Sequence, residues 1–407
     1  MANCPPGRSP APATLGPRGR LNRRGGRAPW PLHLTRVTAD HQINAAKRSK
    51  AAPPWHGPGN PAPPETRLIL AGPVIAGVTL VAALLATRSA GVPLRDPGDV
   101  AATRLGIAAC MIVVLMVFDI LIRAGRGSER ALPSASEVRD AARERWNPYR
   151  LSAVAIALVS FYVTYLAYRN LKSVVPLIRP GDIFDGQLAD IDRSLFAGND
   201  PAELLHSVFG TGVAAHALSG IYMLFFLFIP VCLALALVLS ADSRPGLFFT
   251  AALSLNWALG AASYFLLPSL GPIYADPGAF AALPDTQVSD LQASLIDHRA
   301  EFLGDPEAAG AAQSIGAFAS LHVAIFFTVA AATQLLGLSR ALKVSAWTLT
   351  GLTVLATIYF GWHYLLDDVG GVAIALASLA LARVLTGIDL RAARRLRRVP
   401  APAPEPA

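Results

Sequence analysis

Residues 344–387 read VSAWTLTGLTVLATIYFGW, then HYLLDDVGG, then VAIALASLALARVLTG without interruption. Each outer segment approaches the ~20 apolar residues that an α-helix needs to cross the ~30 Å hydrocarbon core of a bilayer. The segment between them holds one histidine and two adjacent carboxylates. Ionisable groups at membrane depth are costly and usually face a bundle interior or a wet cavity, so this segment is expected to carry function.

The rest of the chain repeats the apolar pattern. Of its 407 residues, 53% are hydrophobic and 15% are charged, which is too apolar for an ordinary soluble domain. Long runs with little or no charge predict eight membrane-spanning helices, at 68–87, 105–122, 151–168, 217–240, 246–268, 319–338, 344–362 and 364–386. We therefore predict an all-α polytopic membrane protein with about eight transmembrane helices, instead of buried core helices in a large soluble protein.

The distribution of Lys and Arg predicts the orientation. Most of the 35 Lys and Arg residues fall in cytoplasmic segments if the N-terminus lies inside the cell. We expect a multi-pass protein of the cell membrane with both termini cytoplasmic. His363, His322 and the segment after the third helix then gather on the extracytoplasmic face. Cytoplasmic flanks near anionic lipid account for the net charge of +8, and we expect no nucleic-acid partner.

Composition divides the chain into four parts. The predicted parts are a disordered basic cytoplasmic tail (1–66), two extra transmembrane helices with a cytoplasmic loop (67–150), a six-helix domain (151–386) and a basic, Pro-rich cytoplasmic tail (387–407). The three cysteines suggest no disulfide or metal framework.

His363 and Asp367 are spaced i, i+4, which places both side chains on one helical face. A carboxylate in that position can hold one imidazole nitrogen and leave the other free as a nucleophile or general base. Two other interpretations remain open at this point. His363 could be an interfacial histidine capped by Asp367, or the pair could be two metal ligands.

Two further clusters of polar residues are predicted at the same membrane face, one in the sixth predicted helix and one just after the third. His322 supplies a second imidazole that can donate a proton to a leaving group. Ser320, near the first turn of its helix, suits an anion or simply caps the helix. Lys172 and Arg179 could neutralise phosphate oxygens, with Arg179 able to bind two of them, or could form an ordinary juxtamembrane charge pair.

Together these residues resemble the signature motifs of a known family. In order along the chain, the three motifs of the type-2 phosphatidic acid phosphatase superfamily are matched by Lys172-x6-Arg179-Pro180, Ser320-x-His322 and His363-x3-Asp367. The segments ASLHVA and WHYLLDDVGG look like the branch that contains inositol phosphorylceramide synthases, the inositolphosphotransferase-like members. The resemblance covers residues 151–386, the six-helix domain.

The resemblance implies a catalytic role for three of these residues. His363 would attack phosphorus and become a phosphohistidine, Asp367 would orient it, and His322 would protonate the departing oxygen. The first-motif cations and the second-motif serine would bind the substrate phosphate. The family chemistry is metal-free, so no metal and no cofactor are expected, and fixed donors and cations must stabilise the charge.

The chain also departs from the phosphatases of the family. Ala356 and Thr357 stand where those enzymes usually carry Ser-Arg before the third-motif histidine, and Ala319 replaces a common proline. One phosphate-binding cation is therefore missing. Its loss favours the synthase-like branch and raises the importance of Arg179.

The expected function is an integral-membrane phosphotransferase acting on a lipid phosphate or phosphoinositol-type headgroup. Its partners would be a lipid-phosphate substrate, membrane lipid and a polyol acceptor. With water as acceptor, the same site would be a lipid phosphate phosphatase. The alternative from another class is a transporter or flippase that uses the histidines as a proton relay, although no internal repeat with paired broken helices is apparent.

The outer segments predict structure around this site. Residues 184–195 have the pattern of an amphipathic helix at the interface, and Asp200-Pro201 is a helix-opening pattern. The segment 269–318 is long enough for a lid or a flexible excursion. Gly370 and Gly371 would allow close helix approach.

Overall fold

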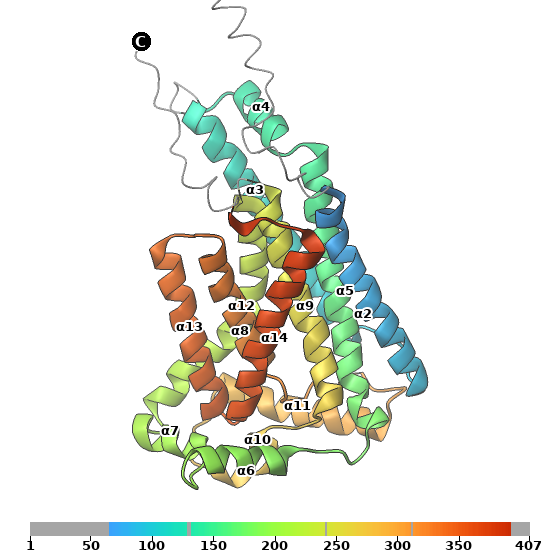
Figure 1. The fold of residues 1–407 in the computed structure, drawn as a ribbon, viewed down its shortest axis with the longest axis vertical. Helices are drawn as coiled ribbons and strands as arrows, with labels where there is room; N and C mark the ends of the chain where they lie inside the picture. The colour runs from blue at the N-terminus through green and yellow to red at the C-terminus, as the bar shows by residue number, and fades with distance from the viewer. Residues whose placement is uncertain (1–64, 128–131, 241, 311, 392–407) are drawn as a thin grey trace, which may run out of the picture. The chain divides into compact units, whose positions relative to one another are not determined.

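The computed structural model describes residues 65–127, 132–240, 242–310 and 312–391, which lie in one compact unit, Pro58–Ala407. The described residues form helices and connecting segments without any strand (Figure 1). Of the predicted tails at 1–66 and 387–407, residues 1–64 and 392–407 lie outside the described residues, and residues 65–66 belong to the first helix. The all-α prediction is confirmed for the described part of the chain.

Seven helices in the described residues are long and apolar enough to cross a membrane. They are α2 (Glu65–Ser89), α3 (Val100–Gly127, continuous with the short η1, Pro97–Asp99), α5 (Pro148–Ile178), α8 (Val213–Leu239), α9 (Ser243–Leu266), α13 (Arg340–Tyr359) and α14 (Leu365–Thr386). These seven correspond to seven of the eight predicted spans.

The remaining predicted span, 319–338, is shorter than expected. Helix α12 covers only Leu321–Leu335, which is 15 residues or roughly 22 Å. Ser320 caps its first turn, and Gly337 adopts a left-handed conformation (φ 66°) just beyond its end. The residues before Ser320 are largely buried in the bundle but are not helical, and α12 begins only after them.

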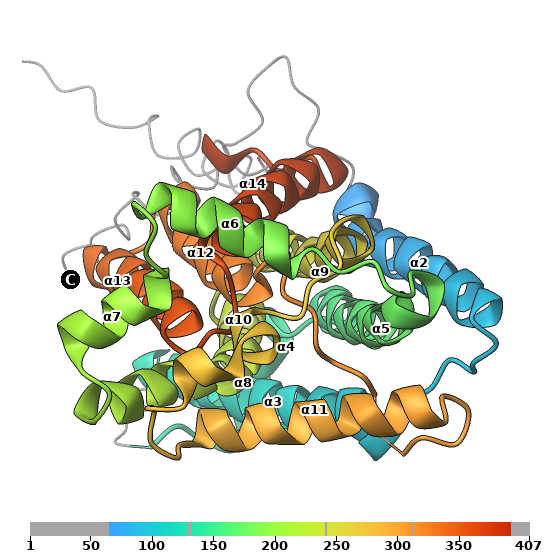
Figure 2. The ribbon, with the colours of Figure 1, turned by 90° about the horizontal axis from the view of Figure 1, so that it is seen from below.

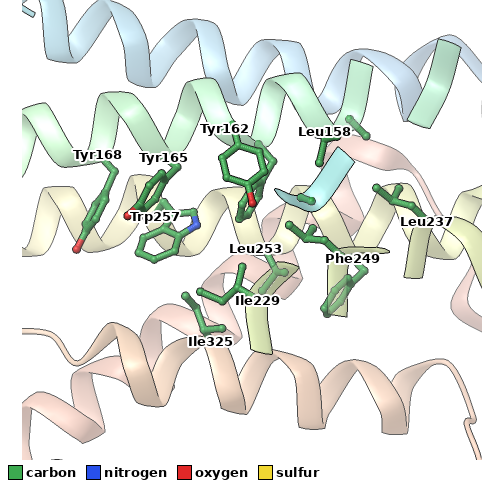
Figure 3. Packing of buried hydrophobic residues seen from close by; sticks show 14 of the residues in the cluster. Leu158, Tyr162, Tyr165, Tyr168, Ile229, Leu237, Phe249, Leu253, Trp257 and Ile325 are labelled. Atoms are coloured by element: carbon green, nitrogen blue, oxygen red, sulfur yellow. The ribbon is translucent and has the colours of Figure 1, made fainter. Parts of the chain in front are cut away.

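The core of the bundle is built around α9, the most enclosed of the seven long helices. Aromatic and aliphatic side chains of α5, α8, α9 and α12 interdigitate there, including Tyr165, Ile229, Trp257 and Ile325 (Figure 3). Helix α2 packs along α5 and α9, and α3 packs along α8. The two extra helices are thus in direct contact with the six later ones.

Short helices lie across one end of the bundle, and α4 (Ala135–Arg145) lies at the other end (Figure 1). The view from below shows the short helices of the first group spread over the bundle end (Figure 2). They are α6 (Asp185–Leu195), α7 (Pro201–Phe209), α10 (Pro272–Ala275), η2 (Pro277–Phe280) and α11 (Gln287–Gly304). The long segment 269–318 is therefore a structured cover over this end.

The two helices predicted in the outer segments are present in the structure, while the interfacial location of the first stays a prediction. Helix α6 forms where the amphipathic pattern places it, with Leu188 buried while Ile191 and Leu195 are exposed. The Asp200 carboxylate caps α7 by accepting a hydrogen bond from the backbone N–H of Ala202 (2.7 Å). Aspartate at this position satisfies one of the free N–H groups of the first turn.

Candidate active site

His363 lies in a tight turn between α13 and α14. Gly361 adopts φ 66°, and the backbone N–H groups of Trp362 and His363 both donate to the carbonyl of Thr357 (2.9 and 3.4 Å). His363 therefore precedes α14 and is not helical. The i, i+4 spacing had predicted that His363 and Asp367 lie on the same helix. Asp367 sits in the first turn of α14, and its Oδ2 still lies 3.5 Å from His363 Nδ1.

Asp367 is held in place by the start of its own helix. Its Oδ2 accepts a hydrogen bond from the backbone N–H of Tyr364 (2.9 Å), and its side chain is fully buried. Its backbone carbonyl accepts from the backbone N–H of Ser320 (2.9 Å), which joins the α14 turn to the start of α12. The last two predicted motifs are thus linked directly through the backbone.

Glycine permits this close approach. A Cβ on Gly371 would collide with the backbone carbonyl oxygen of Ser320, and one on Gly370 would lie 2.9 Å from the Cβ of Ala319. The packing role predicted for the two glycines is confirmed. Because α14 and the residues before α12 approach so closely, the histidines that flank the contact are brought together.

The imidazoles of His322 and His363 face each other across this contact. Their ring centroids are 6.2 Å apart, with an angle of 55° between the planes. His322 is held between Phe225 (3.9 Å) and Tyr222 (4.4 Å), both from α8. Two histidines that are 41 positions apart in the chain therefore share one location, as the topology predicted.

Several buried polar atoms at this point have no hydrogen-bond partner among the described residues. They are Nε2 of His322, Nδ1 of His363, Oδ1 of Asp367 and Oδ1 of Asp368. Buried polar atoms are nearly always paired in folded proteins, so a cluster of unpaired ones is typical of a functional site. An orphaned imidazole nitrogen is free to exchange a proton with a substrate.

Asp368 is a site residue that the sequence did not assign. It is only 3% exposed, and its Oδ2 accepts a hydrogen bond from the Thr357 hydroxyl (3.1 Å). Its charge acts on His363 and favours a cationic imidazole. The signal was visible, because two adjacent carboxylates precede an apolar helix, but helical spacing singled out only Asp367.

Helix α6 fastens the cover over the start of α14. Asp192 accepts a hydrogen bond from the backbone N–H of Leu365 (2.8 Å). Asp185 accepts from the backbone N–H groups of Leu270 and Gly271 (both 2.8 Å) and from the Tyr364 hydroxyl (3.1 Å). These acidic residues of the amphipathic helix therefore position the loops around the site, a role that no local pattern indicated.

The histidines line a cavity of 240 Å³ that reaches from α12 and the turn before α14 to α3 and α5. Its walls are largely aromatic, with rings from α5, α8, α9 and the turn after α13. The aromatic residues are Tyr165, Tyr168, Tyr222, Phe225, Phe226, Trp257, Tyr264, Tyr274 and Trp362. Lys172 also lines it, with Nζ 3.5 Å from the Tyr264 hydroxyl and over the Tyr264 ring (4.5 Å).

Two predicted substrate ligands lie outside this cavity wall. Ser320 is fully buried, and its hydroxyl accepts from the backbone N–H of Val323 (3.4 Å) as a helix cap. Arg179 ends α5 in a smaller neighbouring cavity, where it pairs with Asp182 (2.9 Å) and donates to the carbonyl of Phe265. The structure therefore brings together His322, His363, Asp367 and Lys172, and does not bring Arg179 to them.

The cavity has two cations that the sequence did not assign, Arg104 and Arg169. Arg169 pairs with Asp96 (2.6 Å), and Arg104 contacts Tyr165 through its Nη1 (2.6 Å). Arg104 stands immediately before the predicted helix 105–122, on the side where Lys and Arg are scarce. That position was the available signal, but it lies outside the region of family resemblance.

Burial lowers the pKa of the His363 imidazole to about 4. The Asp368 carboxylate opposes this shift, and the positive charge of Lys172 adds to it. His363 is therefore neutral near pH 7, which is the form in which an imidazole can act as a nucleophile. The His363 imidazole belongs to the turn between α13 and α14 and not to either spanning helix.

This low pKa predicts an unusual pH profile. The acid limb of kcat/KM, which reports protonation of His363 in the free enzyme, should appear only as the pH approaches 4 and not near 6.5, the ordinary pKa of histidine. A phosphodiester lipid is the right substrate, because its phosphate does not titrate in this range. A decline centred at or above pH 6.5 would contradict a neutral, buried nucleophile.

Within the described ranges, no group of three or more His, Cys, Asp or Glu side chains is arranged to hold a metal ion. His363 and Asp367 are thus not part of such a group there. Metal independence remains a prediction.

Fold and site together define a polytopic membrane protein with paired histidines in an aromatic cavity at one end of the bundle. The family model described as the PAP2 superfamily matches residues 186–381. The match supports assignment to this superfamily; it includes Ser320, His322, His363 and Asp367 and begins after Arg179. Comparison with curated proteins and with solved structures gave no significant match.

Proposed function

We propose that the protein is an integral-membrane phosphotransferase that acts on a lipid phosphate or phosphoinositol-type headgroup through a phosphohistidine-type intermediate. The observation that carries this proposal is the pairing of His322 and His363, 6.2 Å apart, with Asp367 beside the second ring. Superfamily membership supports a phosphatase- or phosphotransferase-type lipid enzyme.

The reaction proceeds in two displacements. Nε2 of His363 attacks phosphorus while Nδ1 faces Asp367, and the bond from phosphorus to the leaving oxygen breaks. His322 gives that oxygen a proton. In the second step an acceptor hydroxyl attacks the phosphohistidine, His322 takes the hydroxyl proton, and His363 is released. Lys172 balances charge on the phosphoryl oxygens.

The cavity supports transfer over hydrolysis. The cavity wall is largely aromatic, and aromatic rings can pack against the C–H faces of a polyol ring. Helix α11 adds Leu291 and Leu295 to the wall and so limits access of bulk water. A polyol that occupies this space would compete with water for the intermediate.

The direct test is to incubate the purified protein with labelled lipid donors, with and without inositol. We expect a new labelled phospholipid that depends on inositol, and full activity in EDTA because no metal takes part. Free phosphate without a new lipid would make the protein a phosphatase. A strict requirement for a divalent metal would refute the metal-free mechanism. Absence of any product, together with substrate-stimulated proton movement in vesicles, would support the transporter alternative.

We also propose a cell-membrane location with both termini cytoplasmic and the active site on the extracytoplasmic face. Helix α4, which carries three arginines and three acidic residues, lies at the end of the bundle away from α6, α7, α10 and α11 (Figure 1). Basic residues favour the cytoplasmic side. Membrane-impermeant labelling of cysteines introduced in α4 and α11 of intact cells would report the two sides, with only α11 expected to react.

A further inference from the structure

The cavity that contains the histidines carries more positive charge than one phosphate requires. Arg104, Arg169 and Lys172 all line it, and among the described residues no Asp or Glu side chain does so. Cavities lined by one sign of charge attract ligands of the opposite sign. The question is which of these cations are free to bind a ligand.

The three cations differ in what already holds them. Arg169 is neutralised by Asp96 at 2.6 Å, with both side chains largely buried. Lys172 lies beside Tyr264, which contributes no negative charge. Arg104 forms no salt bridge with any described carboxylate; it donates to the Tyr165 hydroxyl (2.6 Å) and lies over the Tyr165 and Phe226 rings. A guanidinium has five N–H donors, so most of those of Arg104 remain for a ligand.

Arg104 and Lys172 stand at two ends of one aromatic row. Tyr165 and Tyr168 stack at 6.1 Å on one face of α5 (Figure 3). Tyr168 lies 6.2 Å from Tyr264, which is beside Lys172. Tyr165 and Lys172 are seven positions apart on α5, which is roughly 10 Å along the helix axis. A polyol ring with phosphates on opposite sides can span such a distance.

Arg104 is also close to the reacting centre through the opposite wall. Its guanidinium lies over Phe226 (5.2 Å), Phe226 contacts Phe225 (5.7 Å), and Phe225 contacts His322 (3.9 Å). Only two rings therefore separate the arginine from the second histidine. Arg104 belongs to α3, which lies outside the part of the chain that matches the family model.

We infer that Arg104 forms a second anion-binding subsite, which takes a phosphate carried on a polyol headgroup beyond the phosphorus that His363 attacks. This inference rests on the proposed function, because it takes the cavity to be the substrate site. Arg104 would bind the second phosphate through its unused N–H groups, while its ring contacts hold the side chain in place. Helix α3 thereby gains a role in headgroup selection.

The test compares binding of two lipids that differ by one phosphate, phosphatidylinositol and phosphatidylinositol 4-phosphate. Equilibrium titrations use the full-length His363→Ala protein in neutral detergent, so that neither lipid is turned over. We expect the lipid with the added phosphate to bind more tightly, and its advantage to fall by about 10- to 100-fold in Arg104→Gln, the range for loss of charge-assisted hydrogen bonds. Arg104→Lys should lose part of the advantage, because lysine cannot form the two-pronged contact.

The control is Arg126→Gln, an exposed arginine in the last turn of the same helix, which should leave the advantage unchanged. Competition by free inositol 4-phosphate shows whether a phosphorylated acceptor is recognised in the same way as a lipid headgroup. The inference is overturned if the protein with Arg104 intact does not prefer phosphatidylinositol 4-phosphate to phosphatidylinositol. It is also overturned if Arg104→Gln leaves that preference unaltered. If Arg104→Gln does not fold, Arg104→Lys decides. The binding comparison needs no turnover. Absence of transfer activity would therefore refute the proposed function, while the two lipid affinities could still be measured and compared.

Discussion

Replacement of His363 by alanine is expected to reduce phosphotransfer by roughly 10⁴-fold or more, which corresponds to at least about 5.5 kcal/mol of lost transition-state stabilisation. The reason is that the covalent route has no substitute nucleophile. His322 sits 6.2 Å away between aromatic rings, and Lys172 is held by Tyr264. The measurement is initial rate with a labelled lipid donor, using protein that elutes and inserts normally.

The matched control is His216→Ala, which removes an exposed histidine near the start of α8 and should leave the rate unchanged. A second readout follows the intermediate itself. Label from the donor should remain on the protein after denaturation in base, and should be absent from His363→Ala. A variant that retained activity within about tenfold of the original protein would remove the nucleophile role from His363.

Apolar run length predicted most of the fold. Seven expected spans match helices of the structure because the cost of exposing backbone polar groups to lipid leaves few alternatives to a helix. The eighth, α12, is shorter because the residues before Ser320 turn inward to meet α14 instead of continuing as helix. That contact is tertiary, so hydrophobic periodicity could not reveal it.

A site residue could be predicted from the sequence when it belongs to a short motif and when the predicted topology places it on the same membrane face as the other motifs. His322, His363 and Asp367 met both conditions, and the structure gathers them at one point. Arg179 met them too, but its side chain is committed to Asp182 and to backbone carbonyls at the end of α9. Such local pairing depends on how a helix ends, which spacing alone does not specify.

The residues that sequence reasoning missed reach the site across long stretches of chain. Arg104 enters the cavity because α3 packs on α8, and Asp185 reaches the turn before α14 from the amphipathic helix α6. Thr357, which stands where a phosphatase of the family would carry arginine, instead donates to Asp368. Pairings of this kind follow from helix packing, and a single sequence gives no direct signal for them.

Replacement of His322 by alanine should produce an effect that depends on the leaving group. For an ordinary lipid alcohol, loss of the proton donor is expected to slow the reaction by about 10²- to 10⁴-fold. A p-nitrophenyl ester of the same phosphate needs no proton on departure, so its first displacement should slow by less than about tenfold. The second displacement still needs His322 as a base, and the intermediate should therefore accumulate.

The measurement is the time course of p-nitrophenol release by His322→Ala at high enzyme concentration. A rapid burst of about one equivalent per active site, followed by slow turnover, would show that attack by His363 survives while later proton transfer does not. The geometry leads to this separation of roles, because Asp367 lies 3.5 Å from Nδ1 of His363, whereas His322 pairs with no described carboxylate and lies between the rings of Tyr222 and Phe225. Equal losses for both esters, without a burst, would mean that His322 positions His363 or the substrate and does not transfer the proton.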